Sequence, residues 1–141
     1  MHLHYLVPGD DFSQAGNASA QMKKILQQLG LPSAIIKRTS VAMYEAEINM
    51  VVHAGGGEAS IDISDTEILI VMEDHGPGIA NIEQAMQEGF STAPEKVREL
   101  GFGAGMGLSN MKRNSDQMTI ETVPGQGTKV TMSIKIANEA A

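Results

Sequence analysis

The chain contains no cysteine and no tryptophan, and basic residues are few. The lack of cysteine excludes disulfides, thiolate metal sites and cysteine nucleophiles. Ten Lys and Arg against 17 Asp and Glu give a net charge of −7, which disfavours nonspecific nucleic-acid binding because that binding needs a basic surface. Three Phe and two Tyr also leave few rings on which bases can stack. We therefore expect no nucleic-acid partner.

The sequence also has no apolar run long enough to span a bilayer. Its start, "MHLHYLVPGDD", lacks the basic flank and the small-residue cleavage site of a signal peptide. These absences favour a cytoplasmic protein with no membrane partner. The 141 residues are 42% hydrophobic and 19% charged, which is ordinary for a globular protein, and we expect a single domain over residues 1–141.

Hydrophobic periodicity predicts alternating groups of helices and strands. Helical spacing of apolar residues and the stop signals that follow predict helices at about residues 12–29, 33–54, 81–88 and 106–114. Period-two alternation and β-branched runs predict strands at about residues 3–7, 59–64, 67–72, 117–123 and 128–136. The last two form a hairpin around "PGQG". This order predicts an α+β fold with a mixed, mostly antiparallel sheet and helices on one face.

A glycine-rich stretch, "GFGAGMGLSN", occupies residues 101–110. Gly101, Gly103, Gly105 and Gly107 occur at every second position, in neither the Rossmann nor the Walker spacing. The stretch leads into a predicted helix, whose free amides and positive dipole end favour an anion. A phosphate cradle and a plain mobile loop both fit this pattern.

The second predicted helix carries three polar residues at intervals of four. Glu45, Asn49 and His53 therefore share one stripe of its surface. Asn offers a neutral oxygen ligand for Mg²⁺, and Glu offers a base or a water-orienting group. The alternative is the polar side of an amphipathic helix. Glu47 lies off the stripe, and we expect it to be solvated.

The turn "EDHGPGI" follows the strand predicted at residues 67–72. Asp74 would lie at the end of that strand, where its carboxylate can accept a hydrogen bond from an exocyclic amine such as that of adenine. Gly76 and Gly78 leave room for a flat ring to approach the backbone. An ordinary Pro-Gly turn that begins with Asp is the alternative.

Together these motifs resemble the GHKL ATPases, the superfamily of gyrase, the heat-shock chaperone, histidine kinases and MutL. They are an E-x-x-x-N helix, a D-x-G-P-G-I turn, a glycine-rich loop that opens a helix, and a late Gly-Thr. Within the superfamily, "EDHGPGIANIEQAMQEGFSTA" and "GFGAGMGLSNMKR" resemble the small anti-sigma-type serine/threonine kinases, above all the RsbT-type switch kinases and also SpoIIAB and RsbW. The resemblance implies the two-layer α/β sandwich called the Bergerat fold.

The resemblance also implies a role for each motif in binding ATP and Mg²⁺. Glu45 would be the general base and Asn49 the Mg²⁺ ligand, with His53 beside the phosphates. Asp74 would bind the adenine amine, and Thr128 would help to hold the ring. The segment from about residue 79 to 104 would be a lid over ATP. The other implied nucleotide-binding residues lie in the two glycine-rich turns: Gly76, Gly78, Ile79, Gly103, Gly105, Met106 and Gly107.

The function that we expect from this resemblance is an ATP-dependent protein serine/threonine kinase acting on a small STAS-domain regulatory protein. One alternative is an ATP-binding anti-sigma module that sequesters a sigma factor or another partner. The other is a catalytic domain related to two-component histidine kinases, which 141 residues disfavour because they leave no dimerisation helix with a phospho-acceptor histidine. A downstream phosphatase and a second copy of the chain are further candidate partners.

Overall fold

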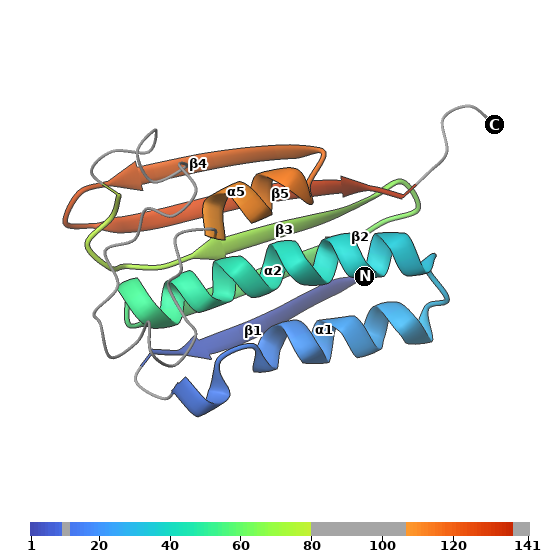
Figure 1. Cartoon of the computed structure of the whole chain (residues 1–141), viewed down its shortest axis with the longest axis horizontal. Helices are drawn as coiled ribbons and strands as arrows, with labels where there is room; N and C mark the ends of the chain where they lie inside the picture. Colours follow the sequence, from blue (N-terminus) through green and yellow to red (C-terminus); the bar gives the residue numbers. More distant parts are fainter. Residues whose placement is uncertain (10–11, 80–106, 137–141) are drawn as a thin grey trace.

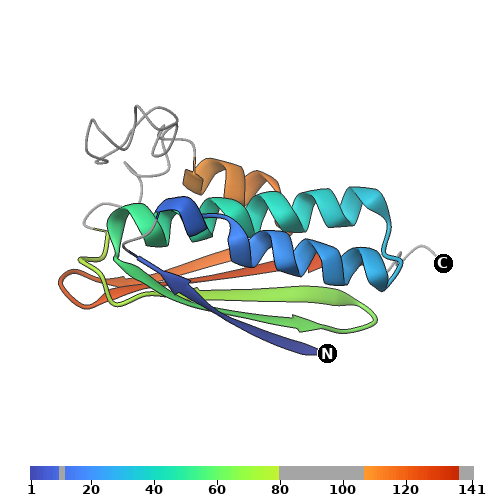
Figure 2. The same ribbon diagram turned by 90° about the horizontal axis from the view of Figure 1, so that it is seen from below.

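The computed structural model describes residues 1–9, 12–79 and 107–136. These residues form two layers, with a five-stranded sheet on one side and the helices packed on one of its faces (Figures 1 and 2). The elements in chain order are β1 (His2–Pro8), η1 (Phe12–Gln14), α1 (Asn17–Gln28), α2 (Ser33–His53), β2 (Gly56–Ile63), β3 (Glu67–Glu73), α5 (Gly107–Arg113), β4 (Gln117–Val123) and β5 (Gly127–Lys135).

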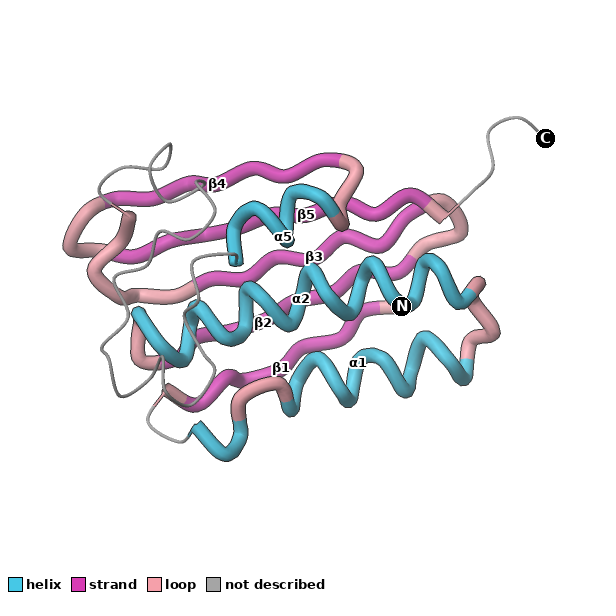
Figure 3. Tube along the Cα trace, in the orientation of Figure 1, coloured by secondary structure: helices cyan, strands magenta, loops and turns pink. Residues whose placement is uncertain are grey.

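The strands are arranged in the order β1-β2-β3-β5-β4, and each neighbouring pair is antiparallel. The tube in Figure 3 shows α2 running along the sheet between α1 and α5. The predicted α+β class, with helices on one face, is confirmed. The helix predicted at residues 81–88 lies outside the described residues.

Alternation along the strands places one set of apolar side chains under the helices. In β3, Ile68, Ile70 and Met72 are buried, whereas Leu69 and Val71 on the opposite face are only partly buried. The helices add a complementary apolar face, which includes Met22, Leu26, Ala42, Met43, Ala46, Met50, Leu108 and Met111. A single core between the two layers therefore fixes α2 and α5 over the centre of the sheet.

The first helix begins later than the sequence predicts. Residues 12–14 form the 3₁₀ turn η1, and α1 starts only at Asn17. Gly16 interrupts the helix because its backbone is left-handed, with φ 89°, a conformation that favours glycine. A Cβ at Gly16 would also lie 2.8 Å from Cε1 of Tyr44 on α2.

Glu47 is buried, with 1% of its surface exposed, so the prediction of a solvated side chain is wrong. Its carboxylate accepts hydrogen bonds from the backbone N–H groups of Gly16 (3.1 Å), Ala18 (3.1 Å) and Ser19 (2.9 Å), and from the Ser19 hydroxyl (2.6 Å). The first N–H groups of a helix have no partner within it, and the N-cap residue of α1 is a glycine with no side chain to offer. Glu47 on α2 supplies the missing acceptor.

No helix within the described ranges is long and apolar enough to cross a membrane.

Candidate functional site

Asp74 follows β3 and is held against the start of β5. Its backbone N–H donates to the Thr128 carbonyl (2.9 Å), and its Oδ1 accepts from the N–H groups of Thr128 (3.1 Å) and Gly76 (3.0 Å). Oδ2 has no hydrogen-bond partner among the residues that the structure describes. The carboxylate is therefore anchored through one oxygen, and the other is available to accept a hydrogen bond from a ligand.

Close backbone contacts fix the turn that begins at Asp74. A Cβ at Gly127 would lie only 2.2 Å from the Asp74 carbonyl oxygen, so this position of β5 admits glycine alone. A Cβ at Gly78 would lie 2.8 Å from the Val123 carbonyl oxygen at the end of β4. The turn is thus packed tightly onto the β4–β5 hairpin, a constraint that was not predicted from the sequence.

The hairpin contributes two threonine hydroxyls to this turn. Thr122 and Thr128 are direct partners across β4 and β5, and their Oγ1 atoms are 3.0 Å apart. Thr122 Oγ1 also accepts a hydrogen bond from the N–H of Ile79 (2.8 Å), which holds the end of the turn. Thr128 was predicted from the sequence, whereas Thr122 was not. The register around "PGQG" was the available signal, because it places Thr122 opposite Thr128.

Glu45 and Asn49 lie half-buried on the side of α2 that meets α5. Glu45 Oε1 accepts a hydrogen bond from Nδ2 of Asn110 at 3.3 Å. The Asn49 amide lies against the first residue of α5, since a Cβ at Gly107 would be 3.1 Å from both its Oδ1 and its Nδ2. The structure therefore brings together Glu45, Asn49 and Gly107, three residues that the family resemblance assigns to one site. Asn110 was missed.

His53 is the last residue of α2 and is half-buried. Burial lowers the pKa of its imidazole below the usual 6.5, which favours the neutral ring. The next residue, Ala54, meets the Asp74 turn, because a Cβ at Gly76 would lie 2.6 Å from the Cα and Cβ atoms of Ala54. The end of α2 and the Asp74 turn are therefore in contact, at the same end of the molecule.

The remaining predicted site residues, Gly103, Gly105 and Met106, lie outside the described residues, as does nearly all of the predicted lid. In the described part of the chain, no group of three or more His, Cys, Asp or Glu is arranged to hold a metal ion.

Sequence comparison places most of the chain in one family. Residues 12–138 match the family described as histidine kinase-, DNA gyrase B- and HSP90-like ATPase. The chain is 39% identical to an anti-sigma F factor of Pasteuria penetrans over 99 residues, which are 65% of this chain but only 63% of that protein. It is 31% identical to the serine/threonine-protein kinase RsbT of Bacillus subtilis over 112 residues, 77% of this chain and 78% of RsbT.

Solved structures share the fold at low sequence identity. The RsbU and RsbW domains of a Mycobacterium tuberculosis protein match with a TM-score of 0.67 and 16% identity, over 98% of this chain and 33% of that one. The SiaB–SiaC complex of Pseudomonas aeruginosa matches with a TM-score of 0.61 and 10% identity, over 94% and 88%. The mycobacterial sensor histidine kinase MprB matches with a TM-score of 0.55 and 14% identity, over 96% and 97%. The family match covers residues 12–138, which is most of the chain, and the fold agrees with it. The chain therefore belongs to the histidine kinase-, DNA gyrase B- and HSP90-like (GHKL) ATPases.

Proposed function

We propose that the chain is an ATP-dependent protein serine/threonine kinase of the anti-sigma or switch-kinase type, which phosphorylates a small STAS-domain protein in a bacterial partner-switching pathway. The observation that carries the proposal is the contact between the Asp74 turn and the end of α2, where Gly76 packs against Ala54. Asp74, whose Oδ2 accepts no hydrogen bond from the described residues, therefore lies next to the end of the helix that carries Glu45 and Asn49. The similarity to a relative named as a serine/threonine kinase supports the same function.

ATP is the substrate that this site would bind, as membership of an ATPase family indicates. Oδ2 of Asp74 would accept a hydrogen bond from the adenine amine, because Oδ1 already holds two backbone N–H groups. The Thr128 backbone is bonded to Asp74, and the Thr128 hydroxyl would help to hold the ring. Gly76, Gly78 and Ile79 would shape the edge of the adenine site, with His53 toward the phosphates.

Asn49 fits a role as Mg²⁺ ligand. Its amide is half-buried beside Gly107 and has no hydrogen-bond partner within the described ranges. An amide oxygen together with water and phosphate oxygens suits Mg²⁺, which keeps several waters when it binds with a nucleotide. The bound ion would neutralise charge on the phosphates. Gly103, Gly105, Met106 and Gly107 would supply the rest of the phosphate site.

Glu45 would act as the general base of phosphoryl transfer. The hydroxyl oxygen of a serine or threonine on the partner attacks the γ-phosphorus, and its proton passes to the Glu45 carboxylate. The bond from the γ-phosphorus to the bridging oxygen breaks, and ADP leaves with that oxygen. Most of the acceleration in such transfers comes from positioning and charge neutralisation, so the base needs a fixed place more than unusual basicity.

A second candidate function is an ATP-binding module that sequesters a sigma factor, and the similarity to an anti-sigma F factor at 39% identity favours it. The similarity to the sensor histidine kinase MprB is one of fold alone, at 14% identity. The cytoplasmic location, a downstream phosphatase and a homodimer stay predictions from the sequence.

The deciding experiment is to incubate the protein with radiolabelled ATP and a candidate STAS partner, then treat the products with acid and with alkali. We expect acid-stable label on the partner, since serine and threonine phosphates survive acid. Acid-labile label would instead indicate histidine phosphorylation. Partner binding that depends on ATP, without any label, would favour the sequestering module. Glu45→Ala is the matched control, which should bind ATP and transfer little label.

A further inference from the structure

We infer that Asn110 is a positioning residue, which holds the carboxylate of Glu45 in place through a hydrogen-bond chain that starts at Arg113. The inference rests on the proposed function, since it concerns how Glu45 acts as the base. Asn110 lies in the middle of α5 and faces α2. Its Nδ2 donates to Glu45 Oε1 at 3.3 Å, and its Oδ1 accepts from Nη2 of Arg113 at 3.2 Å.

The chemistry of the two neighbours fixes the orientation of the Asn110 amide. A guanidinium can only donate hydrogen bonds, and an ionised carboxylate can only accept them. The amide oxygen must therefore face Arg113 and the amide nitrogen must face Glu45. A flipped amide would place its oxygen against the carboxylate and its NH₂ against the guanidinium, losing both bonds.

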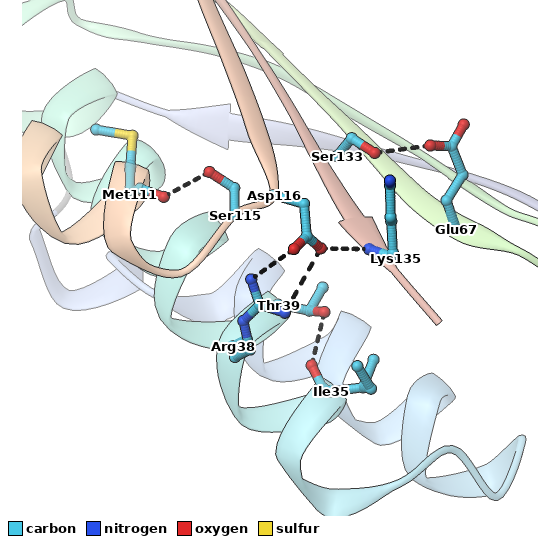
Figure 4. A network of polar contacts seen from close by, with 9 residues as sticks. All are labelled: Ile35, Arg38, Thr39, Glu67, Met111, Ser115, Asp116, Ser133 and Lys135. Atoms are coloured by element: carbon cyan, nitrogen blue, oxygen red, sulfur yellow. Dashed lines mark hydrogen bonds and ion pairs between the residues drawn. The ribbon is translucent and has the colours of Figure 1, made fainter. Parts of the chain in front are cut away.

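Contacts at both ends of α5 keep Asn110 level with Glu45. The two helices are antiparallel, so the start of α5 meets the later part of α2: Gly107 lies against Asn49. Beyond the end of α5, Asp116 forms an ion pair with Arg38 near the start of α2, with Nη2 and Oδ1 3.3 Å apart (Figure 4). The Glu45–Asn110 bond lies between these two contacts.

The buried side chains of α5 prevent the helix from rotating away from α2. Leu108 and Met111 flank Asn110 in sequence and are both buried in the core. A rotation that removed Asn110 from Glu45 would pull at least one of them out of the core. Asn110 is therefore presented to Glu45 by packing as well as by polar contacts.

This arrangement assigns different tasks to the two oxygens of Glu45. Oε1 is engaged by Asn110, so Oε2 is the atom that would receive the proton from the partner's hydroxyl. The bond also limits rotation of the carboxylate about its terminal torsion, which is otherwise broad. Loss of this bond should reduce the rate of transfer and leave nucleotide binding nearly unchanged.

The test is a double-mutant cycle of Asn110→Ala and Glu45→Ala, followed by phosphoryl transfer from radiolabelled ATP to the STAS partner in single-turnover mode. We expect Asn110→Ala alone to lower the transfer rate by roughly 10–10²-fold, the scale of a misplaced catalytic group. ATP affinity by calorimetry should stay within about twofold. In the Glu45→Ala background, Asn110→Ala should have almost no further effect, since the two residues act as one unit.

Asn110→Asp is the second variant, because it keeps the shape of Asn110 and its bond to Arg113 but offers Glu45 no donor. It should lose at least as much transfer as Asn110→Ala. Lys112→Ala, an exposed position on the same helix, is the matched control and should transfer at the unmodified rate.

Two results would overturn the inference. Transfer at the unmodified rate in Asn110→Asp would show that Glu45 does not need the bond. Equal effects of Asn110→Ala in both backgrounds would show that Asn110 acts independently of Glu45. If Glu45→Ala itself leaves transfer intact, the proposed role of Glu45 fails, and the role of Asn110 fails with it.

Discussion

The Oε1 atom of Glu47 lies 2.6 Å from the Ser19 hydroxyl and 2.9 Å from the Ser19 backbone nitrogen, so one carboxylate on α2 caps the start of α1. Both side chains are buried. A buried carboxylate is stable only when its oxygens are well hydrogen-bonded, and Glu47 reaches this state by accepting four hydrogen bonds. The bonds also join two helices that are separate in the sequence.

Replacing Glu47 should therefore destabilise the protein strongly. Glu47→Ala leaves backbone N–H groups buried without acceptors, and we expect the free energy of unfolding to fall by about 3 kcal/mol or more. Glu47→Gln should also destabilise, because its NH₂ would face N–H donors. Urea denaturation measures both losses. Glu121→Ala, exposed on β4, is the control and should change stability by less than about 0.5 kcal/mol. A loss below about 1 kcal/mol in Glu47→Ala would contradict this account of the cap.

Asp116 should contribute a pH-dependent part of the stability. The backbone N–H of Lys135 (2.7 Å) is the largest influence on the Asp116 carboxyl and lowers its pKa below the ordinary 3.8. Burial opposes this shift, and the hydrogen bond and charge of Arg38 lower the pKa further. A lowered folded-state pKa adds stability that is present above pH 3.8 and is lost as the pH falls through the folded pKa. Asp116→Asn should cost about 1 kcal/mol or less at pH 7, because the ion pair is partly exposed.

This difference between the native protein and Asp116→Asn should stay constant from about pH 7 to 5 and shrink below about pH 4. Urea denaturation at three pH values measures it. Asp65→Asn, at an exposed turn, is the control variant. A difference that grew as the pH fell would exclude the ionised Asp116 as its source.

Asp74→Asn should remove most nucleotide binding. Asn keeps an oxygen that can accept from Thr128 and Gly76, so the fold should survive, but an NH₂ replaces the oxygen that would accept from adenine. Losing a hydrogen bond to a charged group costs about 1.5–3 kcal/mol, or roughly a 10–150-fold weaker affinity for ATP. Calorimetry measures the affinity, and Asp65→Asn is again the control. Equal affinity in Asp74→Asn would rule out this placement of adenine.

Glu45→Ala should separate chemistry from binding. A general base acts only as the transition state forms, so ATP affinity should change little while phosphoryl transfer falls by roughly 10²–10⁴-fold. Single-turnover transfer of label to the STAS partner measures the rate, and calorimetry measures the affinity. An unchanged transfer rate in Glu45→Ala would show that Glu45 is only part of the polar surface of α2. Loss of ATP binding as well would point to damage to the fold or to the metal site.

The predicted elements agree with the described structure where short-range pattern decides the outcome. The alternation in β3 and the hairpin around "PGQG" follow from local preference and side-chain period, and both were predicted. The start of α1 was not, because it depends on Tyr44 against Gly16 and on the Glu47 cap, contacts between residues about 30 positions apart. A short stretch of sequence does not show which distant residues will contact Gly16 and the start of α1.

The same distinction applies to the candidate site. Asp74, Glu45 and Asn49 could be proposed because each lies in a recognisable motif. Thr122 and Asn110 were not predicted. The position of Thr122 follows from the register of β4 and β5, and that of Asn110 follows from the packing of α5 on α2. Glu47 was misjudged because helical spacing separates the faces of a helix but does not say what covers each face, and α1 covers this one.

The core between the two layers is rich in methionine: Met22, Met43, Met50, Met72, Met111 and Met132 are all buried there. Methionine is unbranched and adapts its shape easily, so the helices can shift slightly over the sheet without opening voids. Asp74 and Thr128 belong to the sheet side, whereas Glu45 and Asn49 belong to the helices. A ligand that contacts both the sheet and the helices would therefore stabilise one particular spacing between the two layers. Part of its binding free energy would be used to restrict the movement of the helices relative to the sheet.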